Sequence, residues 1–265
     1  MKILLIGATG PTGRELLAQG IALGHEVTAT VRNPETASLP AGARIVRADV
    51  LNAASMAAAV AGQDVVISSL GSKLSRKPTT LFSAGTRNLI DAMNSSGVGR
   101  LVCITGIGAG DSRGPGGFFY DRIFQPLLLN EIYKDKDRQE ELIRASSLDW
   151  TIVRPGTLTN GPRTQHVRSW TDLTGVTVGK ISRADVAWFI FNCLNDQKSI
   201  RSTLTIACRA ERTGSALAAS IRLRLPNSVR STPPSIQKAE EGEASGPNRT
   251  PGLQRHHVSA VFKAG

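Results

Sequence analysis

The chain has 265 residues, of which 40% are hydrophobic, and this length can bury the core of one or two domains. Its net charge is +11: residues 1–208 carry +6 from 23 basic and 17 acidic residues, and residues 209–265 carry +5 from 9 and 4. Neither part contains a dense run of Lys and Arg, or basic residues interleaved with aromatic ones, so we expect no nucleic-acid partner.

Cysteine usage and hydropathy narrow the class of protein further. Cys103, Cys193 and Cys208 lie in apolar or strand-like sequence without the spacing of metal ligands, so we expect reduced thiols and no metal site. No apolar run approaches the length of a membrane-spanning helix, and the first predicted strand begins at Lys2, so we expect no signal peptide. The sequence therefore predicts a cytoplasmic protein without a membrane partner.

A glycine-rich turn near the start of the chain is its most informative feature. An apolar run of strand length, residues 3–6, leads into Gly7, Gly10 and Gly13, and an amphipathic helical pattern covers residues 14–23. This arrangement can point backbone N–H groups at the pyrophosphate of a dinucleotide. Gly7 can make the tight turn, Gly10 can let the backbone approach the phosphates, and Gly13 can let helix and strand pack closely. A purely structural turn is the alternative.

Strand and helix patterns then alternate to about residue 207, which is typical of a parallel sheet covered by helices on both faces. The further predicted strands are 26–31, 43–46, 64–69, 100–105, 150–154 and 203–207. The further predicted helices are 53–60, a segment that starts at Pro78 and includes Met93, 130–146 and 183–194. We expect one α/β domain over residues 1–208, a single doubly wound parallel sheet of the Rossmann type.

Two segments break this alternation. Residues 106–129 are rich in glycine and then aromatic, and they follow the carboxyl end of a predicted strand, where ligands bind in open parallel sheets. A substrate-contacting lid and an ordinary surface loop are both open interpretations. Residues 209–265 contain five prolines and lose all hydrophobic periodicity, so we expect a disordered basic tail with a short helix near 215–225. A shifted reading frame would give a similar change of composition.

With these elements in place, the chain resembles the atypical short-chain dehydrogenase/reductase family. It is most similar to the single-domain NAD(P)H-binding branch that includes biliverdin-IXβ/flavin reductase and the NmrA-like proteins. The matching segments are Gly-Ala-Thr-Gly-Pro-Thr-Gly at 7–13, Val-Arg-Asn-Pro at 31–34, Ala-Asp-Val at 48–50, Ser-Leu-Gly at 69–71, Leu-Asp-Trp-Thr-Ile-Val-Arg-Pro-Gly at 148–156 and Ile-Ser-Arg-Ala-Asp-Val-Ala at 181–187. The set is specific for the family and the fold, but not for a substrate.

The resemblance also implies a set of cofactor contacts. Arg32 follows the second predicted strand, where enzymes that prefer NAD usually carry an acidic residue. A guanidinium there attracts a ribose 2′-phosphate, so we predict NADP(H) rather than NAD(H), with a solvated arginine as the alternative. Asp49 would lie beside the adenine, although it could instead cap the next helix or form a turn. The other implied contacts are Gly7, Thr9, Gly10, Pro11, Thr12, Gly13, Val50, Leu70, Gly71, Pro155 and Thr157.

The usual catalytic motif of the family is altered in this chain. Most short-chain reductases use Tyr-x-x-x-Lys, but here Tyr133 is displaced by one position from the register that pairs with Lys136, about 100° around a helix. The motif is therefore not intact. We predict Lys136 as a ligand of the nicotinamide ribose, with a solvated helix face as the alternative. Thr105, at the end of the fifth predicted strand, could bond a substrate carbonyl or its own backbone.

Two functions follow from the resemblance. The first is NADPH-dependent reduction of a small conjugated or carbonyl acceptor, such as a flavin or a quinone, because hydride transfer depends mainly on holding the donor against an acceptor. The second is a non-catalytic NADP(H)-binding redox sensor that acts on a protein partner. Sugar epimerase or dehydratase activity is less favoured, because such relatives usually carry a larger substrate domain and an intact Tyr/Lys pair.

Overall fold

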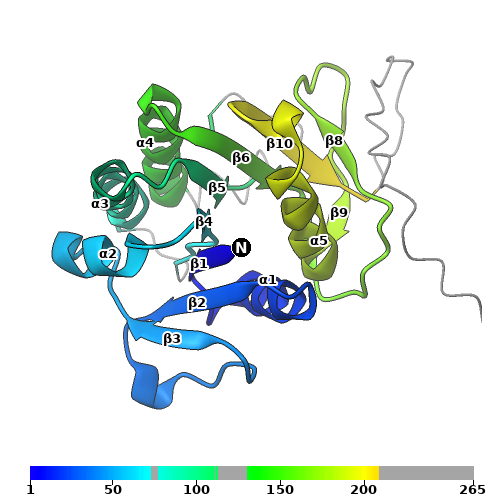
Figure 1. The fold of residues 1–265 in the computed structure, drawn as a ribbon. Coiled ribbons are helices and arrows are strands. Elements are labelled where there is room, and N and C mark those ends of the chain that lie inside the picture. Colours follow the sequence, from blue (N-terminus) through cyan, green and yellow to red (C-terminus); the bar gives the residue numbers. More distant parts are fainter. Residues whose placement is uncertain (73–76, 111, 113–129, 209–265) are drawn as a thin grey trace, which may run out of the picture. The chain divides into compact units, whose positions relative to one another are not determined.

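The computed structural model describes residues 1–72, 77–110, 112 and 130–208 (Figure 1). The predicted tail at 209–265, with its short helix, lies outside the described residues. Most of the segment 106–129, for which a lid and a surface loop are both predicted, also lies outside the described residues.

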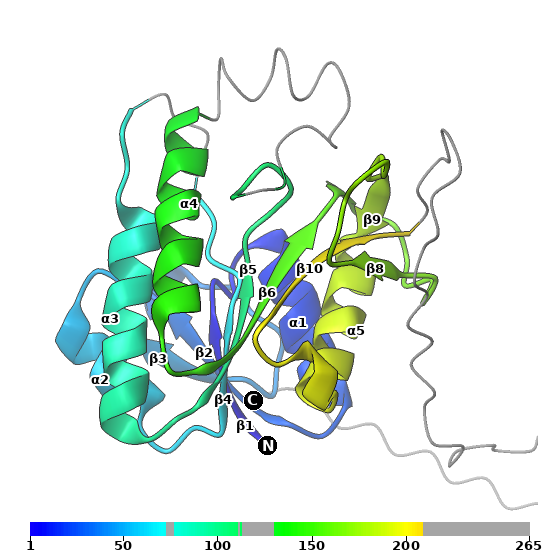
Figure 2. The same ribbon diagram turned by 90° about the horizontal axis from the view of Figure 1, so that it is seen from above.

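An eight-stranded sheet forms the centre of the described fold (Figures 1 and 2). Its strands are β1 (Lys2–Ile6), β2 (Glu26–Val31), β3 (Arg44–Arg47), β4 (Val65–Ser68), β5 (Arg100–Ile104), β6 (Asp149–Pro155), β8 (Arg168–Trp170) and β10 (Ser202–Ala207). The spatial order is β3-β2-β1-β4-β5-β6-β10-β8, and the pairings are parallel except between β10 and β8. The order reverses between β1 and β4, which is where open α/β sheets bind ligands, beyond the carboxyl ends of the strands.

Helices cover both faces of this sheet (Figure 2). They are α1 (Pro11–Ala22), α2 (Ala53–Val60), α3 (Leu81–Ser96), α4 (Asn130–Ala145) and α5 (Arg183–Leu194). Successive side chains of β1 point to opposite faces, so Ile3 joins the core under α1 and α5, whereas Leu4 joins the core under α2, α3 and α4. Burial on both faces explains why this strand is continuously apolar. The predicted doubly wound parallel sheet is confirmed.

Several boundaries differ from the predictions. The first helix begins at Pro11 rather than at residue 14, and α3 begins at Leu81 rather than at Pro78. Three short strands were not predicted: β7 (Thr157–Thr159) and β9 (Lys180–Ser182), which pair in parallel as a separate sheet, and the antiparallel β8. Each has only three residues, too few to show a periodic pattern. Among the described helices, none is both long and apolar enough to cross a membrane.

Candidate functional site

The glycine turn lies between β1 and α1, at the carboxyl end of β1. Gly7 has a φ of +81°, and a Cβ there would lie 2.4 Å from the main-chain oxygen of Ser69. A Cβ on Gly13 would lie 2.1 Å from the main-chain oxygen of Gly7. Both positions therefore require glycine, the first for the tight turn and the second for the close approach of helix to strand. Gly10 is less constrained, since its Cβ would lie 3.3 Å from the same oxygen.

The start of α1 is suited to an anion. Gly10 is the N-cap residue and has no side chain that could accept from the first-turn amides, and Pro11 follows at the first helical position. The amides of Thr12 and Gly13 therefore have no acceptor within the helix. The first turn of this helix carries no acidic residue, so nothing in it repels a phosphate. These residues fit the pyrophosphate of a nicotinamide dinucleotide.

The other predicted cofactor residues follow neighbouring parallel strands and therefore share one edge of the sheet. Arg32 is exposed directly after β2, and Leu70 and Gly71 come after β4. Asp49 follows β3, where its carboxylate accepts from the backbone N–H of Leu51 at 3.0 Å. It does not cap α2, because the N-cap of that helix is Asn52. Thr9 and Pro11 are exposed on the turn, Thr12 is half-buried, and Val50 is buried.

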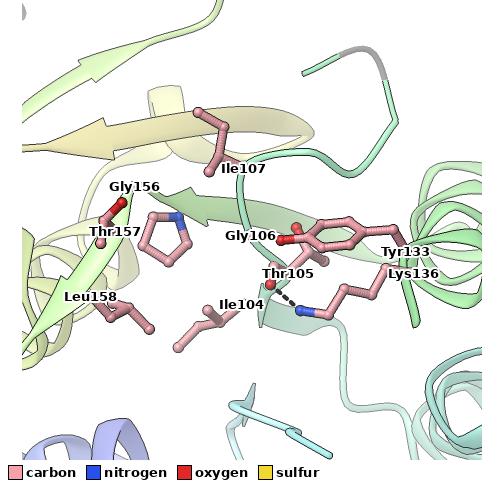
Figure 3. A pocket seen from close by; sticks show the side chains of 10 residues that line it. Ile104, Thr105, Gly106, Ile107, Tyr133, Lys136, Gly156, Thr157 and Leu158 are labelled. Carbon is pink, nitrogen blue, oxygen red and sulfur yellow. Dashed lines mark hydrogen bonds between the residues drawn. The ribbon is translucent and has the colours of Figure 1, made fainter. Parts of the chain in front are cut away.

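A cavity of about 600 Å³ opens at the carboxyl ends of β5 and β6, on the same edge of the sheet (Figure 3). Its lining is mainly apolar, with a few polar side chains. The lining residues are Ile104, Thr105, Gly106, Ile107, Tyr133, Lys136, Pro155, Gly156, Thr157 and Leu158. The structure thus brings together Thr105, Lys136, Pro155 and Thr157, four residues that the sequence analysis placed at the nicotinamide or the substrate.

Tyr133 also lines this cavity, a position that the sequence did not predict for it. Tyr133 and Lys136 are three residues apart on α4, and this spacing places them on one helix face. Figure 3 shows both side chains directed toward Gly106, and a Cβ there would lie 3.7 Å from Tyr133 Oη and 3.8 Å from Lys136 Nζ. The one-residue displacement therefore does not remove the tyrosine from the pocket. The i, i+3 spacing was the signal that could have revealed it.

Lys136 is held in the pocket wall rather than on a solvated helix face. Its ammonium donates to the main-chain oxygen of Thr105 (Figure 3). The ammonium also lies 5.2 Å from the centre of the Phe82 ring. Burial lowers the pKa of Lys136 to about 8, although the negative charge of Glu140 acts in the opposite direction. A lysine with such a pKa can exchange protons near neutral pH, which is typical of functional sites. Its contact with the nicotinamide ribose stays a prediction.

The hydroxyl of Thr105 is already engaged. It donates to Glu140 Oε1 at 2.7 Å rather than to its own backbone. A hydrogen bond from Thr105 to a substrate carbonyl would require this hydroxyl to turn away from Glu140, so that role also stays a prediction. Arg154 pairs with Glu140 in the same buried cluster and anchors the structure at the end of β6.

The cysteines do not contribute to this chemistry. They form no disulfide with one another, and burial raises the pKa of Cys103 and of Cys193 to about 12. These two thiols are therefore protonated and unreactive at neutral pH. Within the described ranges, no group of three or more His, Cys, Asp or Glu side chains could hold a metal ion.

Comparisons with known proteins agree with this geometry. A family model described as NAD(P)H-binding matches residues 7–197. The chain is 32% identical over 206 residues to an uncharacterised sugar epimerase of Bacillus subtilis, covering 75% of this chain and 90% of that protein. It is 30% identical over 199 residues to the 3-diazoavenalumate denitrifying reductase of a Streptomyces species, covering 68% of this chain and 64% of that protein. The anaerobillin reductase ChuY of Escherichia coli O157:H7 has the same fold, with a TM-score of 0.68 at 24% identity over 81% of this chain and 100% of that chain.

Proposed function

The chain belongs to the NAD(P)H-binding family, of the atypical short-chain dehydrogenase/reductase type, and on this premise we propose that it is an NADPH-dependent reductase of a flat conjugated acceptor, such as a flavin or a quinone. The observation that carries the proposal is the convergence of Tyr133 and Lys136 in a mainly apolar cavity. The cavity has the volume of a small-molecule site, and few polar groups line it. The reductase named among the relatives supports the same class of reaction.

The residues divide into a cofactor set and an acceptor set. The glycine turn would hold the pyrophosphate, and Arg32 would bind the 2′-phosphate that distinguishes NADPH from NADH. When bound, NADPH supplies a hydride. Pro155 and Thr157 would lie against the nicotinamide, and the apolar side chains Ile104, Ile107 and Leu158 would pack on the acceptor ring and exclude water.

Tyr133 and Lys136 would assist the proton transfer that accompanies the hydride transfer. The phenol of Tyr133 would donate its proton from Oη to the acceptor and recover one from solvent. The Lys136 ammonium, close to the same point, would stabilise the negative charge that develops there. Both electrons come from the hydride, so the acceptor is reduced by two electrons and no other reductant is needed.

Sugar epimerase activity is the alternative raised by the name of the Bacillus relative. The hydroxyls of a sugar need hydrogen-bonding partners when they leave water. The cavity offers Thr105, Tyr133, Lys136 and Thr157, and the Thr105 hydroxyl already donates to Glu140. A planar conjugated acceptor matches this lining better than a sugar does.

The test is turnover of NADPH with a panel of acceptors. Loss of NADPH absorbance is followed with FMN, dichlorophenolindophenol and a quinone, for the natural protein and for Tyr133→Phe. We expect turnover of at least one acceptor, and we expect Tyr133→Phe to lower kcat by about a hundredfold without changing the affinity for NADPH. Tight NADPH binding without turnover of any acceptor would contradict the reductase and favour a redox sensor that acts on a protein partner.

A further inference from the structure

A buried ion-pair cluster lies next to the pocket. Glu140, whose side chain is fully buried, accepts from Arg154 Nε at 3.0 Å, from Arg154 Nη2 at 2.5 Å and from Arg144 Nη2 at 2.7 Å. Thr105 Oγ1 donates to the same carboxylate at 2.7 Å. Burial alone would raise the pKa of Glu140, but Arg154, Thr105 and Arg144 together hold it below its usual value. The carboxylate is therefore charged at neutral pH.

Thr105 connects this cluster to Lys136. Glu140 accepts a hydrogen bond from the hydroxyl of Thr105, and Lys136 donates to the main-chain oxygen of the same residue. Lys136 and Glu140 are four residues apart on α4, so they lie one helical turn apart on one face. The end of β5 is thus held between two successive turns of the helix that carries Lys136.

The loop that follows β5 packs against the Glu140–Arg154 ion pair. Gly110 has a φ of +56°, and a Cβ there would lie 2.3 Å from Arg154 Nη2 and 2.9 Å from Glu140 Oε2. Its backbone N–H donates to Asp137 Oδ1 at 2.6 Å. This loop supplies Gly106 and Ile107 to the cavity wall. The position of the wall therefore depends on the cluster as well.

We propose that Glu140, held by Arg154, is a positioning residue for the reaction: it fixes the end of β5 so that the Thr105 carbonyl holds the Lys136 ammonium in the pocket, and its negative charge stabilises that ammonium. The inference rests on the proposed function only in giving Lys136 a role in turnover. The coupling between Glu140 and Lys136 can be measured without any acceptor.

The direction of the effect follows from the charges around Lys136. Tyr133 and Glu140 face it from α4, and Cys103 faces it from β5. Arg144 and Arg154 lie behind Glu140. Removing the Glu140 charge takes a negative charge away from one helical turn beyond Lys136 and leaves the positive charges of Arg144 and Arg154 in place, so the pKa of Lys136 falls. Removing Arg144 has the opposite effect, because the Glu140 charge is then less neutralised.

The experiment measures the titration of Lys136 directly. The cofactor-free full chain is labelled by competitive acetylation over a range of pH, and mass spectrometry follows the peptide that contains Lys136. We expect half-labelling near pH 8 in the natural protein, at lower pH in Glu140→Gln and at higher pH in Arg144→Gln. The matched control is Glu141→Gln, the same change on the exposed side of α4, which should leave the titration unchanged.

Turnover gives a second measurement. With an acceptor that the natural protein reduces, Glu140→Gln should lower kcat about tenfold or more, with little change in KM. The decline of kcat on the alkaline side of the pH–rate profile should begin at lower pH in this variant. Should Glu140→Gln fail to fold, Arg144→Gln still tests the inference, because Arg144 is partly exposed and lies at the edge of the cluster. Titrations of Lys136 that do not move in either variant would overturn the inference. Absence of any turnover, with the titrations shifted as expected, would contradict only the reductase.

Discussion

Arg32 stands exposed after β2, in a segment, Val-Arg-Asn-Pro, that contains no acidic residue. A carboxylate at this position would repel a 2′-phosphate, whereas a guanidinium can bind two of its oxygens. The Arg32 side chain would thus determine the preference between NADPH and NADH, which differ only in the 2′-phosphate. This is the residue on which the proposed preference for NADPH depends.

Replacing Arg32 by aspartate tests that preference. We expect Arg32→Asp to weaken NADPH binding about a hundredfold and NADH binding by much less, because only NADPH carries the 2′-phosphate. Isothermal titration calorimetry with both nucleotides measures the difference. Arg44→Asp is the matched control. Arg44 is an exposed arginine at the amino end of β3, whereas the proposed nucleotide site lies at the carboxyl ends of the strands. Equal weakening of both nucleotides would contradict the assignment.

Charged residues within α4 show what a sequence does not reveal about single positions. Residues 134–141 are nearly all charged, which is typical of a solvated helix face, yet Asp135 and Glu140 are completely buried. Asp135 accepts from the backbone N–H of Phe82 near the start of α3, and Glu140 pairs with Arg154. These two partners come from other elements of the fold, α3 and β6. The pattern alone could not identify these two carboxylates as buried.

At the level of secondary-structure elements, the start of α5 is hydrogen-bonded to the segment that precedes β8. The carboxylate of Asp185 accepts from the backbone N–H groups of Thr164 at 2.7 Å and Gln165 at 2.8 Å, and from Ser182 Oγ at 2.8 Å. Burial alone would raise the pKa of Asp185, but these donors hold it below the ordinary value of 3.8. Asp185 therefore stabilises the fold in its charged form.

This contact predicts an acid-dependent stability. Because the folded-state pKa of Asp185 lies below its unfolded value, its contribution is complete above about pH 4 and is lost as the pH falls through the folded-state pKa. We expect Asp185→Asn to lower the free energy of unfolding by about 2 kcal/mol at neutral pH, and this difference to shrink in acid. Urea unfolding at several pH values measures it. Asp91→Asn, at an exposed position on α3, is the control, and a difference independent of pH would count against this account.

For the whole molecule, a nucleotide that binds only the folded chain must stabilise it. At a concentration one hundred times its Kd, a ligand adds about 2.7 kcal/mol to the free energy of unfolding. We expect Tm to rise with the concentration of NADPH, and to rise less with the same concentration of NADH. Differential scanning fluorimetry measures both, with adenosine as a control that lacks the pyrophosphate. A Tm that neither nucleotide changes would contradict the cofactor site.

The sequence predicted the sheet well because β1, β4 and β5 are buried on both faces and are therefore continuously apolar. It also predicted the glycine turn, because Gly7 and Gly13 have steric requirements that only one residue type meets. It did not predict β7, β8 and β9. These three-residue strands depend on pairing with distant segments, such as β8 with β10, and not on a local pattern.

The short β7–β9 sheet bears on how the acceptor specificity of the protein can evolve. Thr157 and Leu158 belong to β7, so part of the cavity wall is built on a pair of strands that are hydrogen-bonded outside the main sheet. The glycine turn follows β1, which lies in the middle of the main sheet. Leu158 is the β7 residue that we place against the acceptor, whereas Thr157 would lie against the nicotinamide. Mutations at Leu158 can therefore alter which acceptors fit without changing the glycine turn, and directed evolution toward new acceptors should begin at this position.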